Sequence, residues 1–520
     1  MKRIKRDFIY IIILLFLLLP SQFIMLKGYK SLDGLIHIKR IEEFHEAILQ
    51  EQFPVRLAPT LVNEIGYPLF IVNYQLPYYL AEVVLLVNNN AELAYKAVML
   101  VSFLLSGIFA YLLFLEISSH PAALAGAIIY SYLPYRFGDL YMRGAFGESV
   151  SFAFIPLVFY GVHRVFKNGK YGLIIFSLGI FSLITTHTVV FVMILPILLL
   201  YTILLLRSDK SHFFRLLLGF ILGICLSSVQ LIPAIFEKHY LKFDTSIAGY
   251  YKDFFTSIYQ ILRIPKMGLD LGSYFQIGLV STLLLGGGVI YFFNKNKFVL
   301  LFLVFNIISI FMNTSFSLPL WNIIPGINYI IYPYRFFIIS ILATAFLAVY
   351  FIDFFKSKIH LAILLILLTL YTNRHFYLNN PPWFEIEPTI TLTTLEEANT
   401  IWTNENTFIY RPLISSNEKF NILNEKISSY SITFATITEK NTNILIRKMY
   451  FPGWQAKING INSPIDIKDG LISIEVPSGN NHVEVYFSES PLRKTANLIT
   501  VLSFAILIFI FVKRPKLLQP

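Results

Sequence analysis

The stretch MKRIKRDFIYIIILLFLLLPSQFIMLKGYKSLDGLIHIKR, residues 1–40, contains the features that decide the fold. A basic head precedes an apolar run from Phe8 to about Lys27, and no small-residue cleavage site follows that run. An apolar run of this length spans the hydrocarbon core of a bilayer, so we predict an uncleaved signal anchor and not a removed signal peptide. Asp33 and His37 come directly afterwards, in Leu-Asp-Gly-Leu-Ile-His, which places an acid at the outer mouth of a membrane bundle.

The composition of the whole chain agrees with a membrane location. Its 520 residues are 56% hydrophobic and 14% charged, and the mean hydropathy is +0.64. These values exclude a soluble globular protein and indicate a polytopic membrane protein. The single cysteine, Cys225, lies within an apolar run, so an intramolecular disulfide is excluded and thiol–metal chemistry is not expected.

The net charge of +11 raises the question of nucleic acid binding. The basic residues, however, are spread over short loops between apolar runs and do not gather in one soluble basic segment. Loops of this kind mark the cytoplasmic side of a membrane protein, so we expect no nucleic acid partner and expect both termini in the cytoplasm. The basic groups assigned to that side are Arg164, Lys167 and Lys170; Arg207, Lys210 and Arg215; Lys295 and Lys297; Lys356 and Lys358; and Lys513, Arg514 and Lys516.

The apolar runs between these groups predict about twelve membrane-spanning helices. The runs lie near residues 8–27, 93–115, 121–137, 149–166, 171–187, 188–206, 214–236, 275–293, 298–313, 334–354, 359–373 and 495–513. Residues 69–87 form a further candidate, which contains Pro77 and Glu82. Counting it as a span would move the basic group at 164–170 to the outside, so we expect a helix lying at the outer membrane interface there.

This orientation places five polar segments outside the cytoplasm: 28–92, 138–148, 237–274, 314–333 and 374–494. The last segment alternates apolar and polar residues, as in LISIEV and HVEVYF, and carries the turn pairs Asn459-Gly460 and Asp469-Gly470. These patterns predict a small β-sandwich or jelly-roll-like domain. The expected organisation is a transmembrane domain at 1–373 with a first outer loop at 28–92, an extracytoplasmic β-rich domain at 374–494, and a final span with a cytoplasmic tail at 495–520.

Asp33 is the first candidate for chemistry. The segment that follows it, 36–53, has apolar residues at helical spacing and is expected to lie on the membrane surface. A carboxylate that is ionised near neutral pH can accept the proton of an acceptor hydroxyl as that hydroxyl attacks a sugar carbon. The other interpretation is a helix cap or a solvated loop acid, and position alone favours it.

Arg143 and Glu148 lie in the second outer loop, RFGDLYMRGAFGES at 136–149. Arg143 beside Gly144 suits a phosphate group, because a guanidinium binds two phosphate oxygens and glycine permits close approach of the backbone. The alternative for Arg143 is a salt bridge to Asp139 or Glu148. Glu148 opens the next span, where a carboxylate also suits a helix N-terminus, so a purely stabilising role is the alternative to a functional one.

His187, in Thr-Thr-His-Thr at the outer junction of two spans, and Arg335, in Tyr-Pro-Tyr-Arg-Phe-Phe at the outer start of another, are expected at the same depth as Asp33. Ionisable residues inside a membrane are candidates for function. The alternatives are a hydrogen-bonded core histidine for His187 and a side chain that reaches the lipid headgroups for Arg335. The expected convergence of these residues on one face favours a site.

The middle of the bundle lacks the residues that ion-coupled transport needs. The runs at 188–206, 275–293 and 359–373 contain no Asp, Glu, Lys or Arg, which argues against a secondary transporter. A glycine-rich phosphate loop, zinc-ligand spacing and a nucleophile elbow are also missing from the sequence, which argues against ATP-driven pumps and the familiar hydrolases. The sequence also has no aspartate-rich nucleotide-sugar motif on the inside, so we expect any sugar donor to be met from the outside, where polyprenyl-phosphate sugars are the usual donors.

Short motifs along nearly the whole chain carry a family resemblance. They are Asp33 with His37; Gly66-Tyr67-Pro68-Leu69-Phe70 with Tyr74; Arg143-Gly144-Ala145 with Glu148; Thr186-His187; Gln230-Leu-Ile-Pro233; Tyr332-Pro333-Tyr334-Arg335-Phe336; and Tyr450-Phe-Pro-Gly-Trp454. With these motifs the chain resembles bacterial YfhO-like membrane proteins and the related group named for 6-pyruvoyl-tetrahydropterin synthase, a domain label that implies no pterin chemistry. Both groups are similar to the GT-C superfamily of polytopic glycosyltransferases, so the resemblance implies a GT-C-like, all-α polytopic membrane bundle.

In that superfamily the first outer loop carries a catalytic aspartate, a juxtamembrane helix follows it, and polyprenyl-phosphate sugars are the typical donors. The resemblance therefore gives Asp33 the catalytic position and supports placing 69–87 at the interface. This chain departs from the commonest first-loop pattern, because Gly34 follows Asp33 where many relatives have another acid. The departure speaks against a metal-dependent mechanism, and we expect neither a metal nor a cofactor.

The sequence and the resemblance together predict a metal-independent, inverting GT-C-type glycosyltransferase in the bacterial cytoplasmic membrane, active on its extracytoplasmic face. Asp33 is the expected base, and Arg143 and Arg335 are expected to hold the donor phosphate. The residues expected to shape the donor or acceptor pocket are His37, Glu148 and His187. The expected partners are a polyprenyl-phosphate sugar, membrane lipid, and a glycan, lipid or protein acceptor that the outer β-domain helps to present. The alternative is a non-catalytic scaffold or carrier of lipid-linked glycans in cell-envelope assembly.

Overall fold

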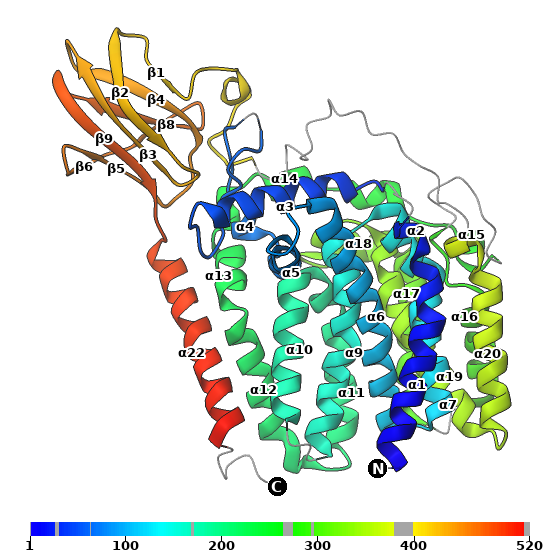
Figure 1. The fold of residues 1–520 in the computed structure, drawn as a ribbon. Helices are drawn as coiled ribbons and strands as arrows, with labels where there is room; N and C mark the ends of the chain where they lie inside the picture. The colour runs from blue at the N-terminus through cyan, green and yellow to red at the C-terminus, as the bar shows by residue number, and fades with distance from the viewer. Residues whose placement is uncertain are drawn as a thin grey trace.

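The computed structural model describes residues 2–26, 31–62, 64–167, 171–263, 274–292, 296–378 and 399–513. It shows an upright bundle of apolar helices, a layer of short helices and loops across one end of the bundle, and a pair of β-sheets beyond that layer (Figure 1). Helix α3 (Gly34–Leu49) lies across this end, which we call the sheet end. The start of α1 (Lys2–Leu18) and the end of α22 (Pro491–Lys513) both lie at the opposite end.

Besides α1 and α22, the upright helices are α6 (Ala91–Ile117), α7 (His120–Tyr132), α9 (Phe146–Phe166), α10 (Gly172–Thr186), α11 (Thr188–Leu206), α12 (Phe213–Leu226), α13 (Ser228–Phe236), α16 (Leu279–Phe292), α17 (Lys297–Met312), α19 (Phe337–Phe354) and α20 (Lys358–Asn373). The helices from α6 to α13 follow one another through short connections, whereas longer segments follow α1, α13, α17 and α20. Short elements at the sheet end include α4 (Leu69–Val72), α5 (Leu76–Leu85), α8 (Pro134–Phe137), η2 (Gly138–Arg143), η5 (Tyr250–Phe254), α18 (Leu318–Ile323), η8 (Ile327–Ile330) and η9 (Pro333–Phe336).

Fewer helices meet the length of a membrane span than the sequence predicts. Within the described residues, six helical segments are long and apolar enough, namely Arg6–Met25, Ala91–Ile117, Phe146–Phe166, Thr188–Leu206, Pro333–Phe354 and Pro491–Val512, and counting two bent helix pairs as single spans gives eight. The runs near 214–236 and 298–313 fall in those pairs, which bend by 70° and 93°. The runs near 121–137, 171–187, 275–293 and 359–373 form helices of only 13 to 16 residues, below the roughly 20 that a span needs.

The difference arises because an apolar run does not show where its helix ends. Helix α7 stops before Leu133, which is extended at ψ 149° and precedes Pro134. A residue before proline disfavours the helical conformation, yet the sequence stays apolar through this point. Residues 69–87 likewise form the two short helices α4 and α5, and neither is long enough to span a bilayer. The predicted cytoplasmic tail at 514–520, with Arg514 and Lys516, lies outside the described residues, as do Lys170 and Lys295.

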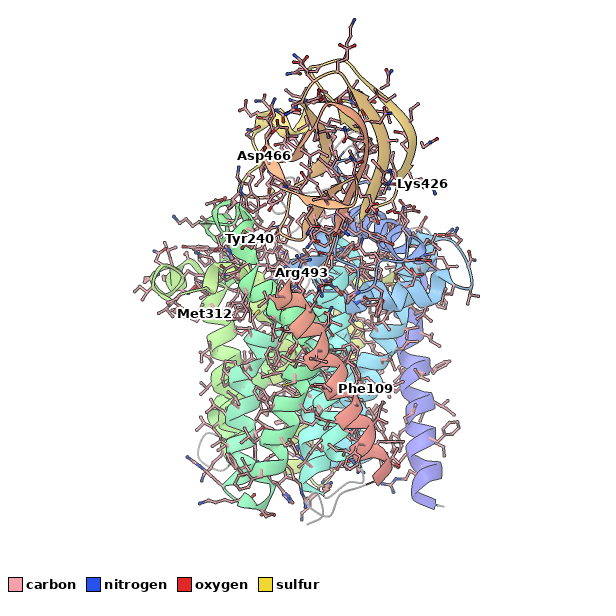
Figure 2. The ribbon with its side chains drawn as sticks, turned by 90° about the vertical axis from the view of Figure 1, so that its left-hand side faces the viewer. Phe109, Tyr240, Met312, Lys426, Asp466 and Arg493 are labelled. Atoms are coloured by element: carbon pink, nitrogen blue, oxygen red, sulfur yellow. The ribbon has the colours of Figure 1, made fainter. Side chains whose placement is uncertain are left out.

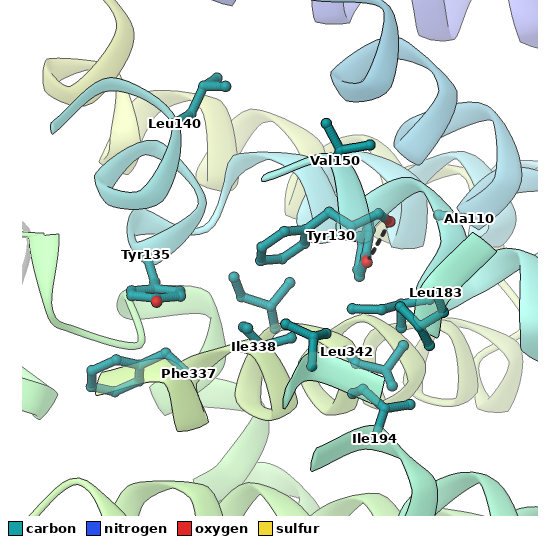
Figure 3. Close-up of a cluster of buried hydrophobic side chains, with 14 of the residues drawn as sticks. Ala110, Tyr130, Tyr135, Leu140, Val150, Leu183, Ile194, Phe337, Ile338 and Leu342 are labelled. Carbon is teal, nitrogen blue, oxygen red and sulfur yellow. Dashed lines mark hydrogen bonds between the residues drawn. The ribbon is translucent and has the colours of Figure 1, made fainter. Parts of the chain in front are cut away.

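A continuous hydrophobic core runs through the middle of the bundle and packs its helices together. Figure 3 shows Ile338 and Leu342 of α19 close to Leu183 of α10 and Ile194 of α11. Most side chains of α19 are buried, and buried aliphatic area of this kind supplies the packing that membrane helices need in place of a hydrophobic effect. One polar group within this core, the Tyr130 hydroxyl, donates to the Phe152 carbonyl at 2.8 Å.

Two antiparallel sheets form the C-terminal β region. One has the order β1 (Ile414–Ser415), β4 (Thr442–Met449), β8 (Leu471–Val476), β7 (Asp466–Lys468), and the other has β2 (Phe420–Ile427), β3 (Ser431–Thr438), β9 (Gly479–Phe487), β5 (Trp454–Ile458), β6 (Ile461–Ser463). One buried cluster takes side chains from both sheets, including Phe434 of β3, Ile446 of β4 and Val485 of β9. The sheets therefore pack face to face as a sandwich.

Both predicted turn pairs form hairpins. Asn459-Gly460 joins β5 to β6 and Asp469-Gly470 joins β7 to β8, and all four residues have positive φ. Two-residue turns with positive φ match the right-handed twist of the strands that they connect, and Asn, Asp and Gly adopt that conformation at low cost. This part of the sequence prediction is confirmed.

The sandwich is attached to the bundle by buried arginines as well as by the chain itself. Arg56, in the segment between α3 and α4, donates through Nε to Glu489 at 2.9 Å and through Nη2 to Asn497 of α22 at 2.9 Å. Arg493 donates to Glu237 at 3.1 Å and also to the Pro452 carbonyl. Figure 2 shows Arg493 where α22 reaches the sheets. The segment between α3 and α4, the sandwich and the last helix therefore share one junction.

Candidate active site

Five segments that begin or end helices meet at the sheet end of the bundle. They are the start of α3, the π-helical turn η2, the first turn of α9, the junction of α10 with α11, and η9. Helix ends carry unpaired backbone groups and suit polar side chains, so they can place charge at the edge of an apolar bundle. These segments carry all of the sequence-predicted site residues: Asp33, His37, Arg143, Glu148, His187 and Arg335.

Glu148 is the centre of the charged cluster. Its Oε2 accepts from Arg143 Nη1 at 2.8 Å and from Arg335 Nε at 3.0 Å, and its Oε1 accepts from the Tyr135 hydroxyl at 2.5 Å. Glu148 is 1% exposed and both arginines are buried. A buried carboxylate is tolerated when its oxygens are paired and hydrogen-bonded. Glu148 therefore fixes two guanidiniums that come from segments far apart in the sequence.

Arg143 is held from two further directions. Its Nη1 also lies 3.1 Å from Asp139 Oδ1, and Asp139 in turn accepts from Ser149 Oγ at 2.5 Å. The next residue, Gly144, has φ +67°, and a Cβ on it would lie 2.1 Å from Ser31 Oγ. Only glycine adopts this conformation freely and also lets the two segments approach so closely. The π-helical turn and its terminal glycine thus bring Arg143 against the segment that leads to Asp33.

Asp33 stands at the N-cap of α3, but its side chain makes no capping hydrogen bond to the helix. Its backbone N–H donates to the Arg143 carbonyl at 2.7 Å, and its carboxylate Oδ2 lies 3.9 Å from Arg143 Nη2. The Asp33 side chain is 39% exposed, whereas the side chains of Asp139 and Glu148 are at most 1% exposed. Asp33 is therefore the carboxylate of this cluster that an incoming hydroxyl can reach.

His37 lies one turn further along α3 and is buried. Its Nδ1 is 3.1 Å from the Tyr78 hydroxyl, and its ring packs near Tyr74, with the two centroids 6.4 Å apart. Burial lowers the pKa of His37 well below its usual value, and the positive charges of Arg40 and Arg143 lower this pKa further. The imidazole is therefore neutral at physiological pH and has one donor and one acceptor nitrogen.

His187 separates α10 from α11. Its Nδ1 accepts from the backbone N–H of Val190 at 3.3 Å and so caps α11, which leaves the ring proton of the neutral form on Nε2. The ring stacks on Tyr74 with the centroids 5.5 Å apart. Tyr74 thus lies between His187 and His37 and connects both histidines to one aromatic wall.

Arg335 is buried, and two of its three guanidinium nitrogens donate hydrogen bonds inside the protein. Besides its bond to Glu148, its Nη1 donates to the Ile330 carbonyl at 2.7 Å. The Tyr332 ring lies beside both arginines, with its centroid 5.1 Å from Arg335 Cζ and 5.3 Å from Arg143 Cζ. At these distances the ring face attracts the guanidinium charge.

These positions decide between several of the alternatives weighed from the sequence. The alternative weighed for Arg335, a side chain that reaches the lipid headgroups, does not agree with its contacts, because the side chain turns inward to Glu148 and to a backbone carbonyl. The salt bridges proposed for Arg143 are both present, and His187 is hydrogen-bonded as a core histidine would be. Asp33 takes the helix-cap position without the capping bond. The roles of these residues in chemistry stay predictions.

The sequence analysis missed Tyr135 and Arg136. Tyr135 donates to Glu148, and Arg136 is fully buried with its Cζ 4.3 Å from the Phe152 ring centroid. A signal was available, because the tetrapeptide Pro-Tyr-Arg-Phe occurs twice, at 134–137 and 333–336. The two copies face each other, with the Tyr135 and Tyr334 rings 6.2 Å apart. A repeated polar motif within apolar sequence points to both sides of the same cluster.

No three His, Cys, Asp or Glu side chains of the described residues are grouped as a metal site. The guanidinium groups of the cluster can bind anions, and its hydroxyl groups can hydrogen-bond to hydroxylated molecules. The arrangement combines a half-exposed carboxylate, two fixed cationic groups and an aromatic wall.

Comparison with known proteins identifies a family and one distantly similar solved structure. No curated protein matches the chain. Among solved structures, it is similar to the oligosaccharyltransferase of Archaeoglobus fulgidus, in complex with Zn and sulfate, with 12% sequence identity and a TM-score of 0.37. The similarity covers 72% of this chain and 54% of the oligosaccharyltransferase, so the chain spans about half the length of that protein. A similarity of this size carries no argument about fold or activity.

The family match is of a different kind, because it extends over more than half of the chain. Residues 72–379 match the family described as "6-pyruvoyl-tetrahydropterin synthase related domain; membrane protein". The matched segment runs from the end of α4 to just beyond α20 and includes Arg143, Glu148, His187 and Arg335. The chain therefore belongs to this family of membrane proteins, to which the YfhO-like proteins are related.

Proposed function

We propose that this protein is a GT-C-type membrane glycosyltransferase, which transfers a sugar from a polyprenyl-phosphate donor to an acceptor on the extracytoplasmic side. The observation that carries the proposal is the position of Asp33, a 39% exposed carboxylate 3.9 Å from a buried guanidinium. Such a pair combines a base that an acceptor hydroxyl can reach with a fixed positive charge for a phosphate. The site lies at the end of the bundle opposite the start of α1. If the N-terminus is cytoplasmic, as the basic loops predict, this end faces outward.

In the proposed reaction the acceptor oxygen attacks the anomeric carbon of the donor sugar. The bond from this carbon to the phosphate oxygen breaks, the acceptor proton passes to the Asp33 carboxylate, and polyprenyl phosphate leaves with the bonding electrons. Inversion at the anomeric carbon follows from this single displacement. Asp33 is the general base, and the negative charge that grows on the phosphate is the charge that the arginines stabilise.

Arg143 and Arg335 have donors to spare for that phosphate. Each guanidinium has five N–H groups, and Glu148 accepts from one nitrogen of each. Glu148 therefore acts in this proposal as a positioning residue that keeps both guanidiniums in place before the donor arrives, which lowers the reorganisation that binding requires. His37, His187 and the Tyr74 ring between them form the neutral wall against which a sugar or acceptor packs.

A specific observation favours a second candidate function, a non-catalytic scaffold or carrier of lipid-linked glycans. Arg143 and Arg335 already pair with Glu148, and Arg143 also pairs with Asp139, so the cluster can stabilise the fold without a substrate. A carrier would need the arginines but would not need the Asp33 carboxylate. The two functions therefore differ in what a change at Asp33 does.

The test is transfer of labelled sugar from a panel of polyprenyl-phosphate sugars to membrane extracts, with wild type, Asp33→Asn and Asp253→Asn at matched expression. Asp253 is an exposed aspartate of η5 at the same end of the molecule. Its replacement by asparagine controls for the loss of a carboxylate as such. We expect Asp33→Asn to lower transfer by at least 100-fold, as loss of a general base does, and Asp253→Asn to transfer normally. Transfer by Asp33→Asn at the wild-type rate would remove Asp33 from the centre, and no transfer by wild type from any donor would favour the carrier.

A further inference from the structure

The backbone just before Arg335 has an unusual conformation at Ile331. Ile331 has φ 63° and ψ −53°, and the N–H of Tyr332 donates to the Ile330 carbonyl at 2.7 Å. Together these values describe a γ-turn of the rare form with positive φ. A β-branched residue is a genuine outlier in this region, because its Cβ substituents crowd the backbone. Strained residues of this kind persist where the surrounding contacts enforce them, and they cluster at functional sites.

The turn sets the direction of one carbonyl group. Closing the chain between Ile330 and Tyr332 makes the Ile330 oxygen an acceptor for two donors, the Tyr332 N–H and Arg335 Nη1, each at 2.7 Å. Arg335 is thereby held at two points, with Nη1 on this oxygen and Nε on Glu148 Oε2. A guanidinium that is hydrogen-bonded through two of its nitrogens cannot rotate about its side chain. The turn therefore fixes the plane of the Arg335 guanidinium.

The same turn places the Tyr332 ring. This ring is half-buried, stacks on Tyr334 with the centroids 4.9 Å apart, and meets the edge of Phe254 at 5.0 Å. Both site guanidiniums lie within 5.3 Å of its centroid. A change of φ at Ile331 would rotate the chain directly before Tyr332 and move the ring away from both cations.

We infer that Ile331 is a positioning residue, whose strained turn fixes Arg335 and Tyr332 so that the arginine pair is preformed for the phosphate of a lipid-linked sugar. The inference rests on the proposed function for the identity of the ligand. The backbone of Ile331 carries this role, because Ile331 directly precedes Tyr332 and any change of its φ is passed to the site.

The test compares three variants in detergent micelles: Ile331→Pro, Ile331→Gly and Ile324→Pro. Proline fixes φ near −65° and cannot form the turn, whereas glycine adopts positive φ freely. Ile324 is the matched control, because its φ of −74° already suits proline. Each proline variant loses one backbone hydrogen bond of 2.9 Å, from residue 331 to the Asn328 carbonyl or from residue 324 to the Leu320 carbonyl. The readouts are the dissociation constant for polyprenyl phosphate without a sugar, the KM and kcat of transfer, and the thermal unfolding profile.

We expect Ile331→Pro to bind polyprenyl phosphate at least tenfold more weakly and to raise the donor KM by a similar factor, with the acceptor KM unchanged. Ile331→Gly, which keeps the turn, should bind within about threefold of wild type, and Ile324→Pro should bind normally. Normal binding by Ile331→Pro would overturn the inference, and so would equal weakening in Ile331→Gly, which would assign the effect to the side chain. If wild type binds polyprenyl phosphate without transferring sugar, the proposed function fails and the binding data still decide the inference. If wild type does not bind it, both fail.

Discussion

One carboxylate, that of Glu148, balances two buried guanidiniums, and this makes it the most sensitive residue of the cluster. Glu148→Gln keeps the shape of the side chain but removes its charge, so Arg143 keeps the carboxylates of Asp139 and, at 3.9 Å, Asp33, while Arg335 keeps the Ile330 carbonyl. Removing one member of a buried ion pair typically costs about 3–5 kcal/mol. We expect Glu148→Gln to lose about this much unfolding stability, measured by thermal or denaturant unfolding in detergent.

The control for Glu148→Gln is the same substitution in an exposed pair. Glu42 lies 3.2 Å from Lys39 and its side chain is 51% exposed, so Glu42→Gln should change stability by less than about 1 kcal/mol. Equal effects of the two substitutions would show that the Glu148 cluster does not behave as a desolvated network. Sequence reasoning found the charged members of this cluster because ionisable residues at the ends of apolar runs stand out. It could not assign their pairing, because Glu148 and Arg335 are 187 positions apart.

The π-helical turn η2 is the element on which the site depends, and Gly144 ends it. Gly144→Ala would place a Cβ 2.1 Å from Ser31 Oγ and 2.7 Å from the Tyr95 hydroxyl in a left-handed backbone conformation. The conformation alone costs an alanine about 1–2 kcal/mol, and the displaced Ser31 adjoins the segment that carries Asp33. We expect Gly144→Ala to lower unfolding stability by at least this amount and to lower transfer more than tenfold, measured in the assays described for Asp33.

Gly286 offers a matched glycine for this experiment. It lies within α16, and a Cβ on it would meet nothing within 4 Å. Gly286→Ala should therefore be neutral or stabilise the protein by up to about 1 kcal/mol, as alanine does within a helix. Loss of stability in both variants to the same extent would contradict the role given to Gly144.

At the scale of elements, the sequence predicts what is local and fails where distant contacts decide. Asn459-Gly460 and Asp469-Gly470 predicted their hairpins because two residues suffice to determine that turn. The count of about twelve spans is not confirmed, because six described helical segments, or eight with the two bent pairs, reach the length of a span, and apolar runs continue through breaks such as Leu133-Pro134. The strained turn at Ile331 has no sequence signal, since isoleucine is among the residues least expected there.

For the whole molecule, the contact between the sandwich and the first outer loop should depend on pH through Lys448. This lysine of β4 is buried and donates to the Glu64 and Pro59 carbonyls at 2.8 and 3.1 Å. Burial lowers its pKa to about 8, against about 10.4 in an unfolded chain. Between these values the unfolded state binds more protons than the folded state, so the contribution of Lys448 to stability rises with pH across this window.

The comparison of wild type with Lys448→Met isolates this effect, because methionine keeps the apolar stem without the titrating group. We expect wild type to gain roughly 1–3 kcal/mol relative to Lys448→Met between pH 7.5 and 10.5, the amount that a shift of this size implies. The measurement is thermal unfolding of both proteins over that range. Parallel curves for the two proteins would mean that Lys448 titrates normally and that the docked contact is open to water.

The junction made by Arg56 has a consequence for how the protein is made. Arg56 belongs to the first loop to leave the ribosome, but its partner Glu489 follows 433 residues later. At about 5–20 residues per second, the nascent loop waits roughly 20–90 s before that partner exists. During biosynthesis Arg56 and Leu57, a member of the sandwich core, must be sheltered by lipid, by a chaperone or by the insertion machinery. A chain that terminates early would leave Arg56 and Leu57 permanently without these contacts. Proteases and chaperones could recognise an unfinished molecule by these exposed residues.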